Sequence, residues 1–87
     1  MDIAFHVDPL DKLKPYKDSS VAMMRAAVVR GHHVFAIEPG NVFARAGSVQ
    51  AFAKKLAVKP ADDVRDQAAH PDWFSADEVQ IRALKTF

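Results

Sequence analysis

Large apolar side chains alternate with Ala4 and His6 near the start of the chain, over residues 3–7. This run ends at Asp8-Pro9, so it predicts a short strand with at least one buried face. Residues 10–17 then carry Pro15 and four charged side chains, which is typical of a loop.

A helix is predicted directly after this loop. Three candidate N-cap residues, Asp18-Ser19-Ser20, precede it, and Gly31 supplies the stop signal at its end. Its large apolar residues follow the i, i+3, i+7 spacing of one helical face and are Val21, Met24 and Val28. We therefore expect these three side chains to face the core.

The next apolar run completes a strand–helix–strand unit. Residues 33–37 are almost all apolar, and the Pro-Gly-Asn sequence at 39–41 turns the chain. If both strands lie in one sheet, they run parallel and the crossover is right-handed. The sequence therefore predicts an α/β fold.

The segment that follows predicts a hairpin. Residues 42–45 and 48–53 flank Gly47, where the chain must reverse. The alternative is a helix over residues 49–58, because most of these residues are good helix formers. We favour the hairpin because of the position of Gly47.

The last third of the chain mixes a loop with apolar residues. Residues 60–71 are polar and bracketed by prolines, which predicts a loop with a helical turn within 62–69. Residues 73–74 and 79–81 are apolar and flank a polar stretch, so they predict a second small hairpin. We expect Trp73 to be buried.

Two parallel strands and some hairpins cannot cover both faces of a parallel sheet, which needs further strands and helices. We therefore expect residues 1–87 to form a single, incomplete domain. The apolar edge left open should recruit other chains, so we expect a homo-oligomer.

Composition excludes several classes of protein. Hydrophobic residues make up 49% of the chain and charged residues 26%, a balance typical of globular domains. The net charge of +1 and the lack of a basic cluster argue against nucleic-acid binding. The chain has no cysteine, no apparent signal peptide and no run long enough to span a membrane. We expect a soluble, cytoplasmic protein.

Common catalytic motifs are missing. The three glycines form neither a dinucleotide-binding nor a phosphate-binding loop, so we expect no nucleotide site. His32-His33 is the most tempting metal pair, but adjacent residues on a strand point to opposite faces. We therefore expect no metal site and no catalytic residue, and interpret the pair as a helix-to-strand junction with one exposed imidazole.

The candidate binding site is the loop between the first strand and the helix, because open α/β sheets bind ligands at the carboxyl ends of their strands. A helix start offers free N–H groups and a partial positive charge to a carboxylate or phosphate. Ser19 and Ser20 add hydroxyl donors, and Lys17 adds a cation. The alternative is plain helix capping by Asp18 or Ser19, in which case Asp18 would occupy the same amides.

These residues resemble those of a known family. Asp8-Pro9, a loop, and Lys17-Asp18-Ser19-Ser20 leading into a helix are similar to the opening of prokaryotic glutathione synthetases. The later segments of the resemblance are Glu38-Pro39-Gly40-Asn41-Val42, the hairpin at Gly47, Leu56-Ala57-Val58-Lys59, Trp73-Phe74 and Leu84-Lys85-Thr86-Phe87. The similarity spans nearly the whole chain, and the order and spacing of the motifs carry it.

The resemblance implies a pre-ATP-grasp (Rossmann-like) domain that lacks the ATP-grasp domain expected to follow it. The family's enzyme uses ATP and Mg²⁺ to activate the carboxylate of γ-glutamylcysteine as an acyl phosphate, which glycine attacks to give glutathione. The nucleotide and metal ligands lie in the ATP-grasp portion, so the chain alone should be inactive. Six positions match the family's motifs, and the resemblance implies that they line the substrate side. They are Asp8, Pro9, Lys17, Asp18, Ser19 and Ser20.

Two other interpretations stay open at this point. The chain could be a free-standing interaction module that kept this fold and binds a protein or a small acid. It could also be an unrelated small Rossmann-like domain. All three interpretations require the strand–helix–strand unit at the start.

Overall fold

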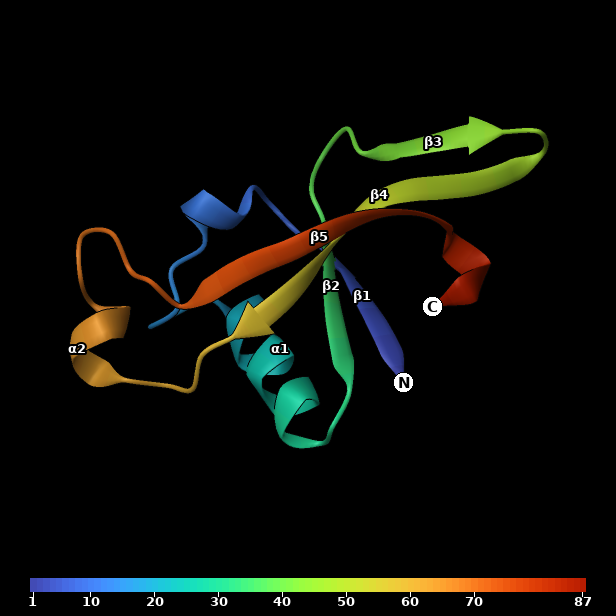
Figure 1. The fold of residues 1–87 in the computed structure, drawn as a ribbon. Coiled ribbons are helices and arrows are strands. Elements are labelled where there is room, and N and C mark those ends of the chain that lie inside the picture. The colour runs from blue at the N-terminus through green and yellow to red at the C-terminus, as the bar shows by residue number, and fades with distance from the viewer.

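The chain opens with the predicted strand–helix–strand unit (Figure 1). A computed structural model describes residues 1–87. Strands β1 (Asp2–His6) and β2 (His33–Ile37) run parallel, with Asp2 opposite His33 and His6 opposite Ile37. Helix α1 (Ser19–Val29) connects them, so the prediction of an α/β start is confirmed.

Helix α1 begins and ends where the sequence indicates. Asp18 is its N-cap residue, and Gly31 follows it with a φ of 84°, a conformation that favours glycine. Its buried residues are Val21, Met24 and Ala27. The prediction that Val28 faces the core is wrong: this side chain is 39% exposed, because the last turn of α1 borders an open groove.

The hairpin prediction is confirmed, and the alternative helix over residues 49–58 is wrong. Strands β3 (Val42–Arg45) and β4 (Ser48–Val58) pair antiparallel. The two turn residues, Ala46 and Gly47, both have positive φ angles, 51° and 76°, as tight hairpin turns require. Small side chains suit the sheet interior, and the alternating Ala51 and Ala53 are fully buried.

The prediction of a second hairpin is wrong. Residues 74–83 form one strand, β5 (Phe74–Ala83), which pairs antiparallel with β4 along its length. The stretch 75–78 contains no glycine or proline and pairs with β4 on both sides of a register shift, so it continues the strand. One register shift, between Lys55 and Leu56, accommodates the long pairing.

Strand β4 is the centre of a mixed five-stranded sheet. The order is β1-β2-β4-β3, with β5 on β4 as well. β2 and β3 pair with different halves of β4, so β3 and the first half of β4 extend as an arm away from α1 and α2 (Figure 1). Two parallel strands thus continue into an antiparallel sheet, and the molecule is elongated, 46 × 26 × 21 Å.

Short helical turns lie in the segments outside the strands. The loop after β1 contains a 3-10 helix, Leu10–Lys12. Helix α2 (Asp63–Asp66) lies within the predicted helical turn at 62–69, and a second 3-10 helix, Leu84–Thr86, follows β5. No helix in the chain has the length and apolar character that crossing a lipid bilayer requires.

The core has two parts, one on each face of the sheet. Beneath α1, the buried residues are Val7, Leu10, Leu13, Val21, Met24, Ala27, Val34, Ala36, Leu56 and Trp73. On the other face they are Phe35, Ile37, Ala51 and Ala53, against which Ala4 and Phe87 pack. Trp73 is 1% exposed, which confirms the prediction that it is buried.

Candidate functional site

The carboxyl ends of β1 and β2 meet at one edge of the sheet, where Glu38 follows β2 directly. One carboxylate oxygen of Glu38 accepts a hydrogen bond of 2.8 Å from the backbone N–H of Leu10, in the loop after β1. Its other oxygen accepts a hydrogen bond from Nζ of Lys54 on β4. A single side chain thus ties together the loop and two strands.

The environment of Glu38 keeps it ionised. The ammonium group of Lys54, and to a smaller extent the N–H of Leu10, hold the pKa of this carboxyl below its ordinary value, although partial burial opposes them. The side chain of Glu38 is 17% exposed. An ionised carboxylate therefore anchors the loop at neutral pH.

The loop between β1 and α1 is a series of turns. The carbonyl of Pro9 accepts a hydrogen bond of 2.8 Å from the N–H of Lys12, and the carbonyl of Lys14 accepts one of 2.8 Å from the N–H of Asp18. Leu10 and Leu13 insert into the core beneath α1. Buried leucines and local hydrogen bonds therefore fix where the helix begins.

The start of α1 differs from the capping interpretation. Asp18 occupies the N-cap position, but its carboxylate accepts a hydrogen bond from the backbone N–H of Lys14 and none from the helix. No side chain caps α1. The first amides of an 11-residue helix are thus left unpaired by side chains, and Asp18 does not occupy them.

The six predicted site residues form two groups at the two ends of this loop. Asp8, Lys17 and Ser19 are exposed, and Pro9, Asp18 and Ser20 are half-buried. No hydrogen bond joins Asp8 or Pro9 to the group that starts α1. None of the six lines a hollow of the surface, so the structure does not gather them around one cavity.

Two hollows are lined instead by their neighbours in the same loop. One has a volume of about 530 Å³ and lies between Leu10, Asp11 and Leu13 and the segment 69–74. The other, about 470 Å³, lies between Pro15 and Tyr16 on one side and α1 and α2 on the other. The loop therefore carries concave surface on both of its flanks.

Sequence reasoning missed the roles of Glu38 and Lys54. Glu38 was named only as part of a segment that resembles the family, and Lys54 carried no expectation. A usable signal was present, because Glu38 is the first charged residue after a buried strand, at the edge where Asp8 follows β1. The pairing with Lys54 depends on the sheet order, which no local pattern reveals.

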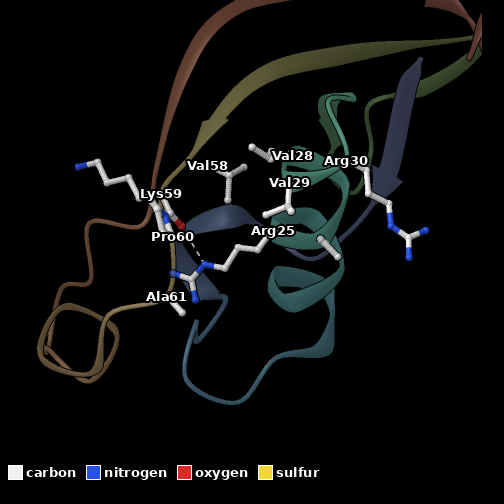
Figure 2. Close-up of a pocket in the computed structure, with 9 residues that line it drawn as sticks. Arg25, Val28, Val29, Arg30, Val58, Lys59, Pro60 and Ala61 are labelled. Atoms are coloured by element: carbon white, nitrogen blue, oxygen red, sulfur yellow. Dashed lines mark hydrogen bonds between the residues drawn. The ribbon is translucent and has the colours of Figure 1, made fainter.

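A third concave surface lies away from this edge, between the second half of α1 and the end of β4 (Figure 2). Val28, Val29 and Val58 line a groove of about 400 Å³. Nε of Arg25 donates a hydrogen bond of 2.9 Å to the carbonyl of Lys59 across it. The lining has no carboxylate, imidazole or hydroxyl group.

The histidine pair does not form a metal centre. His33 is exposed, and its Nδ1 lies 3.0 Å from Oδ1 of Asp2, as expected of one exposed imidazole at a helix-to-strand junction. His32 is half-buried, and its Nδ1 has no hydrogen-bond partner. The chain has no group of three or more His, Asp or Glu side chains that could ligate a metal ion.

Comparison with known proteins gives consistent matches. The family model described as "Prokaryotic glutathione synthetase, N-terminal domain" matches residues 1–87. Similar proteins include the glutathione synthetases of Synechococcus elongatus (36% identical over 89 residues) and Thermosynechococcus vestitus (38% over 88). A third, from Neisseria meningitidis, is 34% identical over 87 residues. Each match covers the whole chain but only 27%, 28% and 26% of the relative, so the chain spans about a quarter of their length.

Proposed function

Because the chain belongs to the family of prokaryotic glutathione synthetase N-terminal domains, we propose that it forms the substrate-side wall of an ATP-dependent ligase that joins γ-glutamylcysteine to glycine. The match of the family model over residues 1–87 carries this proposal. The chain contributes the N-terminal quarter of such an enzyme.

The loop between β1 and α1 is the part of the chain suited to this role. It lies at the carboxyl ends of parallel strands, where α/β sheets bind ligands. The start of α1 presents amides without a side-chain cap, beside the exposed ammonium group of Lys17. γ-Glutamylcysteine carries two carboxylates, and a helix start with a nearby cation favours such groups.

Each of the six residues has a defined part in this proposal. Lys17, Ser19 and Ser20 supply a cation and hydroxyl donors to a substrate carboxylate. Asp18 holds the loop through the N–H of Lys14, and Asp8-Pro9 follows β1 and directs the chain into the loop. These are contributions to binding and positioning, and we assign no catalytic residue to the chain.

ATP and Mg²⁺ do not fit the residues present. The sequence has no glycine-rich phosphate loop, and the chain has no cluster of carboxylates and imidazoles that could hold a metal ion. We therefore derive no catalytic step from these residues and propose that ATP and Mg²⁺ bind to an ATP-grasp domain supplied by the rest of the enzyme. Use of ATP would place that enzyme in the cytoplasm.

A chimeric enzyme tests the proposal. Residues 1–87 would replace the matching quarter of the Synechococcus elongatus relative, and ADP release would be followed with γ-glutamylcysteine and glycine. We expect the chimera to form glutathione and the isolated 87-residue chain to form none. A folded chimera that hydrolyses ATP without making glutathione would contradict the proposal, and so would ligase activity in the isolated chain.

A further inference from the structure

The loop between β1 and α1, residues 8–18, has one hydrogen bond to the sheet edge. The backbone N–H of Leu10 donates it, over 2.8 Å, to Oε2 of Glu38, which lies 28 residues further along the chain. Every other hydrogen bond made by residues 8–18 stays within the loop or joins it to the first turn of α1. Glu38 is therefore the only polar tether between this loop and the strands.

The tether adds a direction that burial of the loop cannot supply. Leu10 and Leu13 insert into the core beneath α1, but hydrophobic burial is not directional. A hydrogen bond requires its donor to point at its acceptor. The bond from the N–H of Leu10 to Glu38 therefore fixes how the backbone is oriented at the first of the two buried leucines.

The carboxylate of Glu38 is itself held from the sheet side. Its Oε1 accepts a hydrogen bond from Nζ of Lys54, on the strand that pairs with β2. The side chains of Glu38 and Lys54 are 17% and 34% exposed. Both oxygens of Glu38 thus have a partner within the chain, and the ammonium group of Lys54 balances its charge. This carboxylate is placed to hold the loop, and it does not add a net negative charge to an edge that would receive an anion.

Consecutive turns connect the tethered residue to the start of α1. The N–H of Leu13 donates to the carbonyl of Leu10 (3.2 Å). The carbonyl of Lys14 then accepts from the N–H groups of Lys17 and Asp18 (3.0 and 2.8 Å). The carboxylate of Asp18 accepts from the N–H of Lys14 in return. The position of Lys17 therefore depends on how the loop is held at Leu10.

We propose that Glu38 is a positioning residue for the dipeptide substrate: it holds the loop in the conformation that presents Lys17 and the start of α1 to a substrate carboxylate. This role rests on the proposed function of the chain as the substrate-side wall of the ligase. Without the tether the loop samples other conformations, and the apparent affinity falls with the fraction of molecules that remain competent. Saturating substrate restores the competent conformation, so the KM rises and kcat stays the same.

Matched substitutions in the chimeric enzyme test this role. Glu38→Ala removes the acceptor for the N–H of Leu10, whereas Glu38→Gln keeps an amide oxygen in its place. Asp2→Ala is the control, because Asp2 forms an ion pair with Arg82 (2.9 Å) at the opposite, amino ends of β1 and β2. The control thus removes a carboxylate from another ion pair of the same sheet and leaves the loop untouched.

Steady-state kinetics separate positioning from stability. We expect Glu38→Ala to raise the KM for γ-glutamylcysteine about tenfold, which corresponds to a competent fraction of about one tenth, with kcat and the KM for ATP unchanged. Glu38→Gln should restore most of the affinity, and Asp2→Ala should keep the KM of the unmodified chimera. A lower kcat at an unchanged KM in Glu38→Ala would indicate loss of folded enzyme and would overturn the positioning role. Equal KM values in Glu38→Ala and Asp2→Ala would overturn it too.

Hydrogen exchange gives a readout that does not depend on catalysis. Mass spectrometry would follow deuterium uptake by residues 8–18 of the folded chimera. We expect faster uptake in Glu38→Ala than in the unmodified chimera or in Asp2→Ala, because the loop opens more readily without its tether. Equal uptake in all three would overturn the tether itself.

The two measurements distinguish failure of this inference from failure of the proposed function. An active chimera whose KM for γ-glutamylcysteine does not respond to Glu38→Ala would overturn the positioning role alone. A folded chimera that makes no glutathione would overturn the proposed function, and the positioning role with it.

Discussion

The guanidinium of Arg25 donates two parallel hydrogen bonds, of 2.8 and 2.9 Å, to the carboxylate of Asp66. The two side chains are only 13% and 8% exposed. Nε of the same Arg25 donates to the carbonyl of Lys59. One residue of α1 therefore contacts both α2 and the end of β4. Helix α2 has only four residues, so it is too short to be stable without such contacts.

Removing this carboxylate should destabilise the chain. Asp66→Ala leaves the half-buried guanidinium of Arg25 without its partner, and we expect a loss of about 3 kcal/mol in the free energy of unfolding, measured by urea denaturation. Val64→Ala changes an exposed side chain of the same helix and should change it by less than about 0.5 kcal/mol. Similar effects of the two substitutions would show that the ion pair does not hold α2.

Stability should fall in acid because of Glu38. Lys54 lowers the pKa of this carboxyl in the folded state below its ordinary value of 4.5, so the unfolded chain binds a proton more readily. The stabilisation is therefore complete above about pH 4.5 and is lost as the pH falls through the folded-state pKa.

Glu38→Gln isolates this contribution. The variant should be less stable than the unmodified chain at pH 7, and the difference should shrink as the pH drops below 4.5. Urea denaturation between pH 7 and pH 3 measures it. A difference that is constant with pH, or that grows in acid, would contradict the assignment of the ion pair to Glu38 and Lys54.

Local patterns were sufficient to predict the first half of the fold. The Asp18 and Gly31 signals mark the ends of α1, and Gly47 marks the turn of the hairpin, because these signals act through neighbouring residues. The strand β5 was missed for the opposite reason. Its polar residues 75–78 form a strand only because β4 offers a partner along its whole length, which is a tertiary effect.

The positions of the six candidate residues in the fold were predictable, but the hydrogen bonds around them were not. The edge of the sheet followed from the strand order, and the structure places the six residues at the two ends of the predicted loop. Helix capping by Asp18 or Ser19 was one of two interpretations, but the carboxylate of Asp18 accepts a hydrogen bond from the N–H of Lys14 instead. Glu38 and Lys54 are 16 residues apart in sequence, so their pairing depends on the antiparallel register of β2 and β4.

A substitution in the turn between β3 and β4 should increase the stability of the chain. Ala46 has a φ of 51°, which an alanine adopts at a cost that asparagine largely avoids. Ala46→Asn should raise the free energy of unfolding by about 0.5 to 1 kcal/mol. Gly47→Ala, at a φ of 76°, should lower it by about 1 kcal/mol. Thermal denaturation of both variants checks the opposite signs, and two changes of the same sign would contradict this account.

The last residue of the chain should contribute to stability. The ring of Phe87 packs edge-on against Phe35, with centroids 5.3 Å apart, and the guanidinium of Arg82 lies 4.1 Å from its centroid. Phe87→Ala removes both contacts and should cost about 1 to 2 kcal/mol. Phe87→Leu keeps the apolar volume but not the aromatic contacts, so an equal loss in both variants would assign the effect to the ring.

Binding of the dipeptide substrate should depend on Lys17. In the chimeric enzyme, Lys17→Ala removes the cation beside the start of α1, and a charge-assisted contact of about 1.4 kcal/mol corresponds to a roughly tenfold higher KM for γ-glutamylcysteine. The KM for ATP should stay unchanged, because the proposal assigns the nucleotide to another domain. Lys12→Ala removes an exposed lysine of the same loop and controls for a general loss of positive charge. Equal KM values for γ-glutamylcysteine in the two lysine variants would show that Lys17 does not contact this substrate. A change in the KM for ATP alone would contradict the assignment of the nucleotide to another domain.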